Sequence, residues 1–179
     1  RENEEINKYW MCDKGMLSYA RAHEDRITEP RVADKNTTAT AALDHAKKLF
    51  AGASAESIAI VLSAQHSSED NFALVTLAKT FIGSGDFFLA GKAKGEADGV
   101  LMVEDRNPNT AGVMQVASTT PPRAFEDLVQ AVKAGRYTHV IALGGDVPVD
   151  PALITAFAKL KGVVTIAAHD GPLAAAAQV

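Results

Sequence analysis

The sequence contains a single cysteine, Cys12, among its 179 residues. One thiol excludes an internal disulfide framework and cannot by itself supply a zinc or iron–sulfur site. The chain also lacks an excess of basic residues, because 18 Lys and Arg stand against 22 Asp and Glu, a formal net charge of −4. This balance excludes a surface built for nucleic acid, which needs a basic footprint.

Long apolar runs are absent as well. No stretch approaches the roughly 18 uninterrupted apolar residues of a membrane-spanning helix, so we expect no direct membrane insertion. The first residues, Arg1 to Glu5, lack the apolar stretch of a signal peptide. Hydrophobic residues nevertheless make up 47% of the chain, which is enough for a real core. Length and composition indicate one α/β domain, alone or with a short appendage.

Both ends of the sequence have the composition of internal segments. The chain starts at Arg1 instead of Met, and residues 172–179 are apolar, without a polar tail. Natural termini are usually polar and exposed. We therefore expect an excised piece of a larger polypeptide; the alternative is a processed mature protein.

Strands and helices are expected to alternate after an irregular N-terminal strap, residues 1–36. The continuous apolar, β-branched run at 57–64 predicts a strand buried on both faces, which is typical of a parallel sheet. Further strands are expected at 87–90, 139–143 and 163–168, and helices beginning near Thr37, Ser67, Pro121 and Pro151. This order predicts an α/β fold, with βαβ units wound into a Rossmann-like parallel sheet over residues 37–179.

Some local details are less regular. In the helix after Ser67, an apolar face is predicted from the helical spacing of Leu74, Leu77, Ala78 and Phe81. Residues 91–122 have no sustained period. Within them, 100–103 is open between a strand and a helical turn, and 106–110 is predicted to be a turn.

Polar residues follow the predicted strands. Because ligands of open α/β sheets bind beyond the carboxyl ends of the strands, these residues are expected at one edge: His66, Gly144, Gly145, Asp146, His169 and Asp170. A ligand or metal site is one interpretation, and ordinary strand endings and helix caps are the other. The glycine pair lacks the third glycine of a dinucleotide loop, and no phosphate-loop motif is present. No catalytic centre follows from these residues.

The strap adds a motif of another kind. Residues 3–15 read Asn-Glu-Glu-Ile-Asn-Lys-Tyr-Trp-Met-Cys-Asp-Lys-Gly. This stretch resembles the molybdopterin oxidoreductase superfamily, and most closely those members that form the large iron–sulfur subunit of the proton-pumping NADH:quinone oxidoreductase, or NADH dehydrogenase (respiratory complex I). Segments 24–30, 63–74, 105–109 and 143–146 are also similar to stretches of that family. The similarity covers nearly the whole chain and is loosest in the middle.

The resemblance implies a role for two residues of the motif. In the family, the motif follows a C-x-x-C-x-x-x-C run, and its cysteine completes a 4Fe-4S cluster, so Cys12 matches the fourth ligand. Lys14 matches a lysine that lies between cluster and pterin in catalytic relatives. Met16 departs from the family, which usually has arginine there. The three other cluster cysteines are absent from the sequence, and the resemblance places them upstream of Arg1 in a longer parent.

Three functions remain open from the sequence. The first is a fragment of that large iron–sulfur subunit: a non-catalytic scaffold for iron–sulfur electron transfer from NADH to quinone, in the cytoplasm at the inner face of the membrane, bound to the other subunits of the complex. Its parent would hold the 4Fe-4S cluster, and the piece itself none. The second is a fragment of a molybdenum or tungsten bis-pterin oxidoreductase similar to formate dehydrogenase, with His66, Asp146 and His169 near the guanosine part of a molybdopterin. The third is a free-standing Rossmann-like module that binds a nucleotide or a protein.

Overall fold

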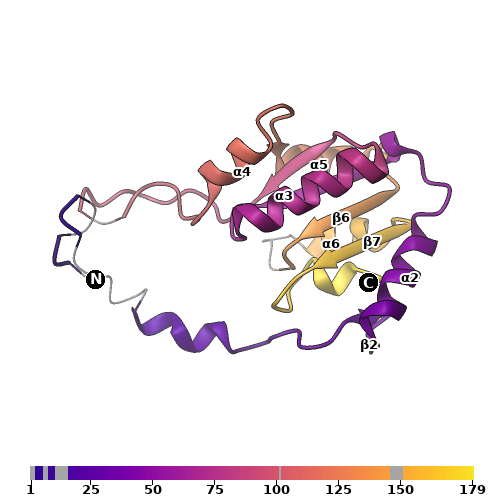
Figure 1. Cartoon of the computed structure of the whole chain (residues 1–179), viewed down its shortest axis with the longest axis horizontal. Helices are drawn as coiled ribbons and strands as arrows, with labels where there is room; N and C mark the ends of the chain where they lie inside the picture. Colours follow the sequence, from indigo (N-terminus) through magenta and orange to yellow (C-terminus); the bar gives the residue numbers. More distant parts are fainter. Residues whose placement is uncertain (1–2, 6–7, 11–15, 101, 146–150) are drawn as a thin grey trace.

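A five-stranded parallel sheet forms the centre of the computed structural model, which describes residues 3–5, 8–10, 16–100, 102–145 and 151–179 (Figure 1). The spatial order of the strands is β5-β4-β3-β6-β7. Their bounds are β3 (Ile58–Ser63), β4 (Phe87–Ala90), β5 (Arg123–Ala124), β6 (His139–Leu143) and β7 (Gly162–Ile166). This arrangement confirms the predicted α/β fold with a Rossmann-like parallel sheet.

Helices cover both faces of this sheet (Figure 1). They are α2 (Ala39–Leu49), α3 (Ser68–Leu77), α4 (Thr110–Val116), α5 (Phe125–Lys133) and α6 (Pro151–Phe157). Helix α3 continues into a π-helical turn, η3 (Ala78–Ile82), and single 3₁₀ turns are η1 (Ser18–Ala22), η2 (Ala55–Ser57) and η4 (Ala174–Ala176). A small antiparallel hairpin, β1 (Arg31–Val32) with β2 (Lys35–Asn36), precedes α2.

Strand β3 shows why the sheet is buried on both sides. All six of its residues are buried. Because successive side chains of a strand point to opposite faces, Ala59 and Val61 join one apolar cluster, whereas Ile60 and Leu62 join the other. A strand that lies between two cores must be apolar at every position, as the sequence of residues 57–64 predicts.

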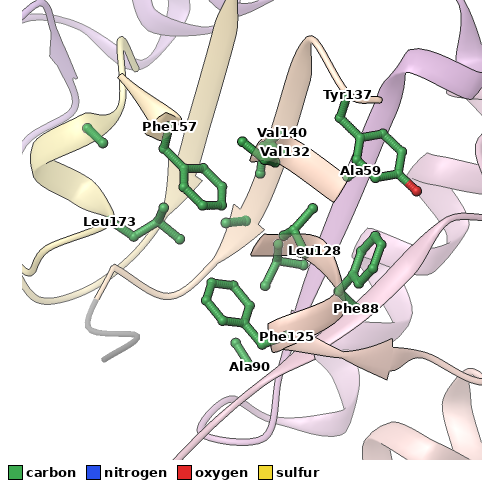
Figure 2. Close-up of a cluster of buried hydrophobic side chains, with 13 residues drawn as sticks. Ala59, Phe88, Ala90, Phe125, Leu128, Val132, Tyr137, Val140, Phe157 and Leu173 are labelled. Carbon is green, nitrogen blue, oxygen red and sulfur yellow. The ribbon is translucent and has the colours of Figure 1, made fainter. Parts of the chain in front are cut away.

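The first cluster lies between the sheet and helices α5 and α6 (Figure 2). Its aromatic rings form two pairs: Phe125 and Phe157 are stacked with centroids 6.4 Å apart, and Phe88 meets Tyr137 edge-on at 5.8 Å. Such pairs stabilise a core by about 0.5–1.5 kcal/mol beyond the burial of their area. The second cluster lies on the opposite face, against α3 and α4.

Two predicted helix starts are confirmed by their caps. The hydroxyl of Thr38 accepts a hydrogen bond from the amide of Ala41 (3.2 Å), which begins α2. The hydroxyl of Ser67 accepts from the amide of Asp70 (3.1 Å), which begins α3. Each cap satisfies one amide that the first turn leaves without a helical partner.

The apolar face expected on α3 is wrong at two positions. Leu77 is 39% and Phe81 79% exposed. The residues that α3 and η3 bury are Asn71, Leu74, Val75 and Ala78. The helix therefore packs in the core through a stripe that contains Leu74 and Ala78, and Leu77 and Phe81 lie outside this stripe.

Residues 91–122 also differ from expectation. Helix α4 begins at Thr110, at the end of the predicted turn 106–110. The pair Pro121-Pro122 does not open a helix, because the short strand β5 follows it and α5 begins only at Phe125. Of residues 100–103, those that the structure describes are neither strand nor helix, and β7 ends at Ile166, before the predicted end at 168.

The described part of the strap is a long segment that runs along the outside of the sheet domain (Figure 1). It holds η1, an extended stretch and the β1–β2 hairpin. No helix among the residues described has both the length and the apolar character needed to cross a bilayer.

Candidate functional site

The sheet has one topological switch point, between β3 and β6. In chain order, β3, β4 and β5 extend the sheet to one side, and β6 and β7 extend it to the other. In open α/β sheets, ligands bind at the carboxyl ends of the two strands where this order reverses. Here these ends lead to His66 after β3 and to Gly144 and Gly145 after β6, so this edge is the candidate site.

The loop after β3 is held in place by Asn71, which is completely buried. Its side-chain oxygen accepts a hydrogen bond from the amide of Ser63 (3.0 Å). Its side-chain nitrogen donates to the carbonyls of Ser63 (3.0 Å) and Ser67 (2.7 Å). One side chain thus fixes the end of the strand to the start of α3.

The N-terminus of α3 already carries negative charge of its own. The hydroxyl of Ser67 caps the helix and donates to the carboxylate of Asp70 (2.8 Å). Glu69 is the second acidic residue of the first turn. The N-terminus of a helix attracts anions. Here two carboxylates already supply the negative charge and would repel a phosphate, so this loop is poorly suited to bind a dinucleotide.

His66 lies in this loop and is half-buried. Its Nδ1 is 2.9 Å from the hydroxyl of Ser63, and its carbonyl accepts a hydrogen bond from the side chain of Asn109 (2.8 Å). A neighbouring pair, Gln65 and Asn107, is joined side chain to side chain at 2.6 Å. The switch-point edge near β3 is therefore a network of the chain's own polar groups.

Asn107 also organises the following turn. Its amide (2.9 Å) and its side-chain nitrogen (2.8 Å) both donate to the carboxylate of Asp105. The nearby hydroxyl of Thr110, and then the hydrogen bonds from Asn107, lower the pKa of Asp105 below its ordinary value. A stable carboxylate at this position anchors the segment that leads into α4.

The two glycines after β6 serve the packing of the chain itself. Gly144 has a φ of +90°, which a side chain would strain. At Gly145 a Cβ would lie 2.9 Å from the Cβ of Ala174 and 3.0 Å from the carbonyl oxygen of His169. The amide of Leu173 donates to the carbonyl of Gly145 (3.0 Å). The close approach that excludes a side chain at Gly145 is thus made by the segment after β7.

His169 is placed away from His66. It follows β7, whereas His66 follows β3, and β6 lies between these strands. Two strand spacings amount to about 10 Å. His169 forms an antiparallel bridge with Arg26 of the strap. The structure therefore brings the two histidines to one edge of the sheet, as expected, but on strands that are not neighbours.

The residue after His169 joins the same contact with the strap. The amide of Asp170 donates to the carbonyl of Asp25 (2.8 Å), and the amide of Ile27 donates to Ala168 (3.0 Å). The guanidinium of Arg31 forms an ion pair with the carboxylate of Asp170 (2.9 Å). The loop after β7 is thereby a docking point for the strap.

Three of the predicted site residues, Cys12, Lys14 and Asp146, lie outside the described residues. Among the residues that the structure describes, no group of three or more His, Cys, Asp or Glu side chains is placed to hold a metal ion.

The asparagines of this edge were missed by the sequence reasoning. Asn71, Asn107 and Asn109 make their decisive contacts with residues 8 to 43 positions away in the chain. The only local signal is the position of Asn71, one turn after the capping residue Ser67, where a side chain can reach back to the loop.

A charged cluster that the sequence analysis also missed lies at the opposite, amino edge of the sheet. Asp86 accepts hydrogen bonds from Arg123 (3.0 Å), Arg136 (3.2 Å) and the hydroxyl of Tyr137 (2.9 Å). The guanidinium of Arg123 lies 4.3 Å from the ring centroid of Phe88. Burial raises the pKa of Tyr137, which keeps its hydroxyl as a donor. This cluster ties β4, β5 and the start of β6 together.

No protein-family model matches the chain, and no curated protein sequence matches it at a significant level.

Proposed function

We propose that this chain is part of the large iron–sulfur subunit of an NADH:quinone oxidoreductase, in which it is a non-catalytic scaffold. The observation that carries the proposal is the attachment of the strap to the sheet domain. The part of the strap after the Cys12 motif is joined to residues 168–170 by Arg26, Ile27 and Arg31. Such an attachment holds the segment after the motif against a rigid sheet.

A scaffold role also fits the state of the switch-point edge. Asn71, Asn109 and Gly145 are all engaged with the chain's own groups there. The first turn of α3 adds the negative charge of Glu69 and Asp70. Both features favour a packed, structural edge over a pocket for the phosphates of a pterin cofactor.

The proposed cofactor belongs to the longer parent. A 4Fe-4S cluster needs four ligands, and this chain offers one thiol, Cys12. When bound, the cluster supplies one-electron transfer. Cys12 would hold one iron, and Lys14 would place a positive charge close to the cluster, which raises its potential. In that assembly the chain is cytoplasmic, peripheral to the membrane, and bound to other subunits of the complex.

The test begins with the coding sequence upstream of Arg1. The proposal requires a C-x-x-C-x-x-x-C run roughly 25–30 residues before Cys12. The longer product, purified without oxygen, is then assayed for iron and for the EPR signal of a reduced cluster. Cys12→Ala should remove that signal, and the matched control Met16→Leu should retain it. Absence of the upstream run, or an unchanged signal in Cys12→Ala, would contradict the proposal.

A further inference from the structure

A cavity of about 500 Å³ lies at the amino edge of the sheet, between the ends of α5 and α6 and the segments that lead into β6 and β7. Three lysines line it: Lys133 from the last turn of α5, Lys159 after α6, and Lys161 just before β7. Of the described residues, none that lines this cavity is acidic. We call it the lysine pocket.

The three lysines have no acidic partner within the described part of the chain, where the ion pairs use other cations. The acidic residues of α5, Glu126 and Asp127, lie in its first turn, at the other end of the helix. Burial lowers the pKa of His139, and the charge of Lys161 lowers it further. The positive charge at this edge is therefore felt by its neighbours.

The helix ends account for only part of this charge. Each helix C-terminus carries roughly half a negative charge, so the ends of α5 and α6 offset about one of the three lysines. A neighbouring cluster adds charge of the same sign, because Arg123 and Arg136 share the single carboxylate of Asp86. Tyr137, which lines the pocket, donates to that carboxylate as well (2.9 Å). The pocket and this cluster together carry an excess of about three positive charges, in a chain whose formal net charge is −4.

The backbone around the lysine pocket is held by hydrogen bonds. The amide of Lys161 donates to the carbonyl of Thr138 (2.9 Å), which ties the loop after α6 to the start of β6. The amide of Arg136 donates to the carbonyl of Ala131 (3.0 Å), and Gly135 ends α5 with a φ of +74°. The lysine stems therefore start from fixed backbone positions around one concave surface.

The chemistry of the pocket fits carboxylates better than phosphate. Bare phosphate binds where the amides of a helix N-terminus converge, but α5 and α6 both present their C-termini here. Lysine is a point charge on a flexible stem, and three of them suit carboxylates at several spacings. Val132, Ala156 and Leu160 add an apolar part to the wall. This combination matches a peptide with acidic residues on both sides of an apolar one.

We propose that the lysine pocket binds an acidic segment of a partner protein, in which aspartate and glutamate flank an apolar side chain such as leucine. The carboxylates pair with Lys133, Lys159 and Lys161, and the apolar side chain lies against Leu160. Complementary charge gives such a contact its specificity and speeds its formation. The inference is independent of the electron-transfer proposal, because it uses only the amino edge of the sheet.

The probe is a blocked peptide of sequence Ser-Glu-Asp-Leu-Asp-Glu-Ser, added to the full chain and followed by isothermal titration calorimetry. Its dissociation constant should rise at least about fivefold between about 50 mM and about 300 mM salt, because salt screens exposed ion pairs. The matched neutral peptide, Ser-Gln-Asn-Leu-Asn-Gln-Ser, should bind at least about tenfold more weakly. Serine in place of the leucine should weaken binding about fivefold, through the lost apolar contact.

Two double variants of the protein locate the binding. Lys159→Gln with Lys161→Gln removes two charges from the lysine pocket and should weaken peptide binding about tenfold. The matched control is Lys47→Gln with Lys48→Gln, which removes two charges from the last turn of α2, outside the pocket. It should change the dissociation constant less than about twofold. Circular dichroism checks that both variants are folded.

Inorganic pyrophosphate is the probe for a phosphate site, and it should displace the peptide only at concentrations well above the peptide's dissociation constant. Tighter binding of pyrophosphate than of the peptide would overturn the choice of ligand. Equal affinity for the neutral peptide would show that charge plays no part. An equal loss in the two double variants would show that the peptide senses only the net charge of the chain. Absence of binding at millimolar peptide would remove the inference, and none of these results bears on the iron of the longer parent.

Discussion

Replacement of Asn71 by alanine should be one of the most damaging single changes in this domain. The side chain makes three hydrogen bonds at the end of β3, of 2.7 to 3.0 Å, and has no exposed surface. The variant leaves the buried amide of Ser63 without a partner, at a cost of about 1–3 kcal/mol. Two carbonyls each lose one donor as well. We therefore expect Asn71→Ala to lower the free energy of unfolding by about 2–4 kcal/mol.

Asn71→Asp separates the acceptor from the donor role of this side chain. Aspartate has the same shape and still accepts from the amide of Ser63, but its carboxylate faces two carbonyl oxygens. Burial and these carbonyls raise the pKa of the new carboxyl above its unfolded value near 3.9. At a pH between the pKa of this carboxyl in the unfolded state and its pKa in the folded state, the folded state binds more protons than the unfolded state. The free energy of unfolding therefore falls as the pH rises. The variant should be closest to wild type at acidic pH.

Urea denaturation at pH 5 and pH 8 measures both effects, and Asn36→Ala, at an exposed residue of β2, is the matched control. The control should change the free energy of unfolding by less than about 0.5 kcal/mol. The reasoning is refuted if Asn71→Ala is as mild as the control. It is also refuted if Asn71→Asp differs from wild type by the same amount at both pH values.

Three other outcomes are expected. Gly145→Ala should lower the free energy of unfolding by about 1–3 kcal/mol, measured by calorimetry, because its Cβ would meet Ala174 at 2.9 Å. Burial lowers the pKa of His139, so below about pH 6.5 the unfolded state binds more protons than the folded state, and the free energy of unfolding should fall as the pH drops. Urea titrations should show that this free energy depends less on pH in His139→Gln. Guanosine diphosphate at millimolar concentration should leave the melting temperature unchanged, because Glu69 and Asp70 place negative charge at the N-terminus of α3. A rise in the melting temperature would favour the pterin alternative.

Much of the fold was predictable because its signals are local. The apolar run of β3 identifies a strand that is buried on both faces. Thr38 and Ser67 identify two helix starts through a hydroxyl that caps an amide three residues on. Helix α4 is harder to recognise, because the residues before it, Asp-Arg-Asn-Pro-Asn, are typical of a turn, and its cap residue, Asn109, makes no side-chain capping bond. The start of this short helix was therefore predicted to be part of a turn.

The position of the candidate site could be predicted from the sequence, but the contacts that fill it could not. Parallel strands end at one edge, so His66, Gly145 and His169 could be placed there from the sequence. What fills the edge depends on contacts between distant segments, such as that of Asn109 with His66 and that of Ala174 with Gly145. Periodicity and spacing carry no information on such contacts.

The error on α3 has a physical cause. Helical spacing places Leu74, Leu77, Ala78 and Phe81 on one apolar face. The helix buries Leu74, Val75 and Ala78 in the core, whereas Leu77 and Phe81 line a cavity beside β7. Phe81 lies in the π-helical turn η3, where the period of 3.6 residues no longer holds, so a spacing counted from Leu74 misplaces it.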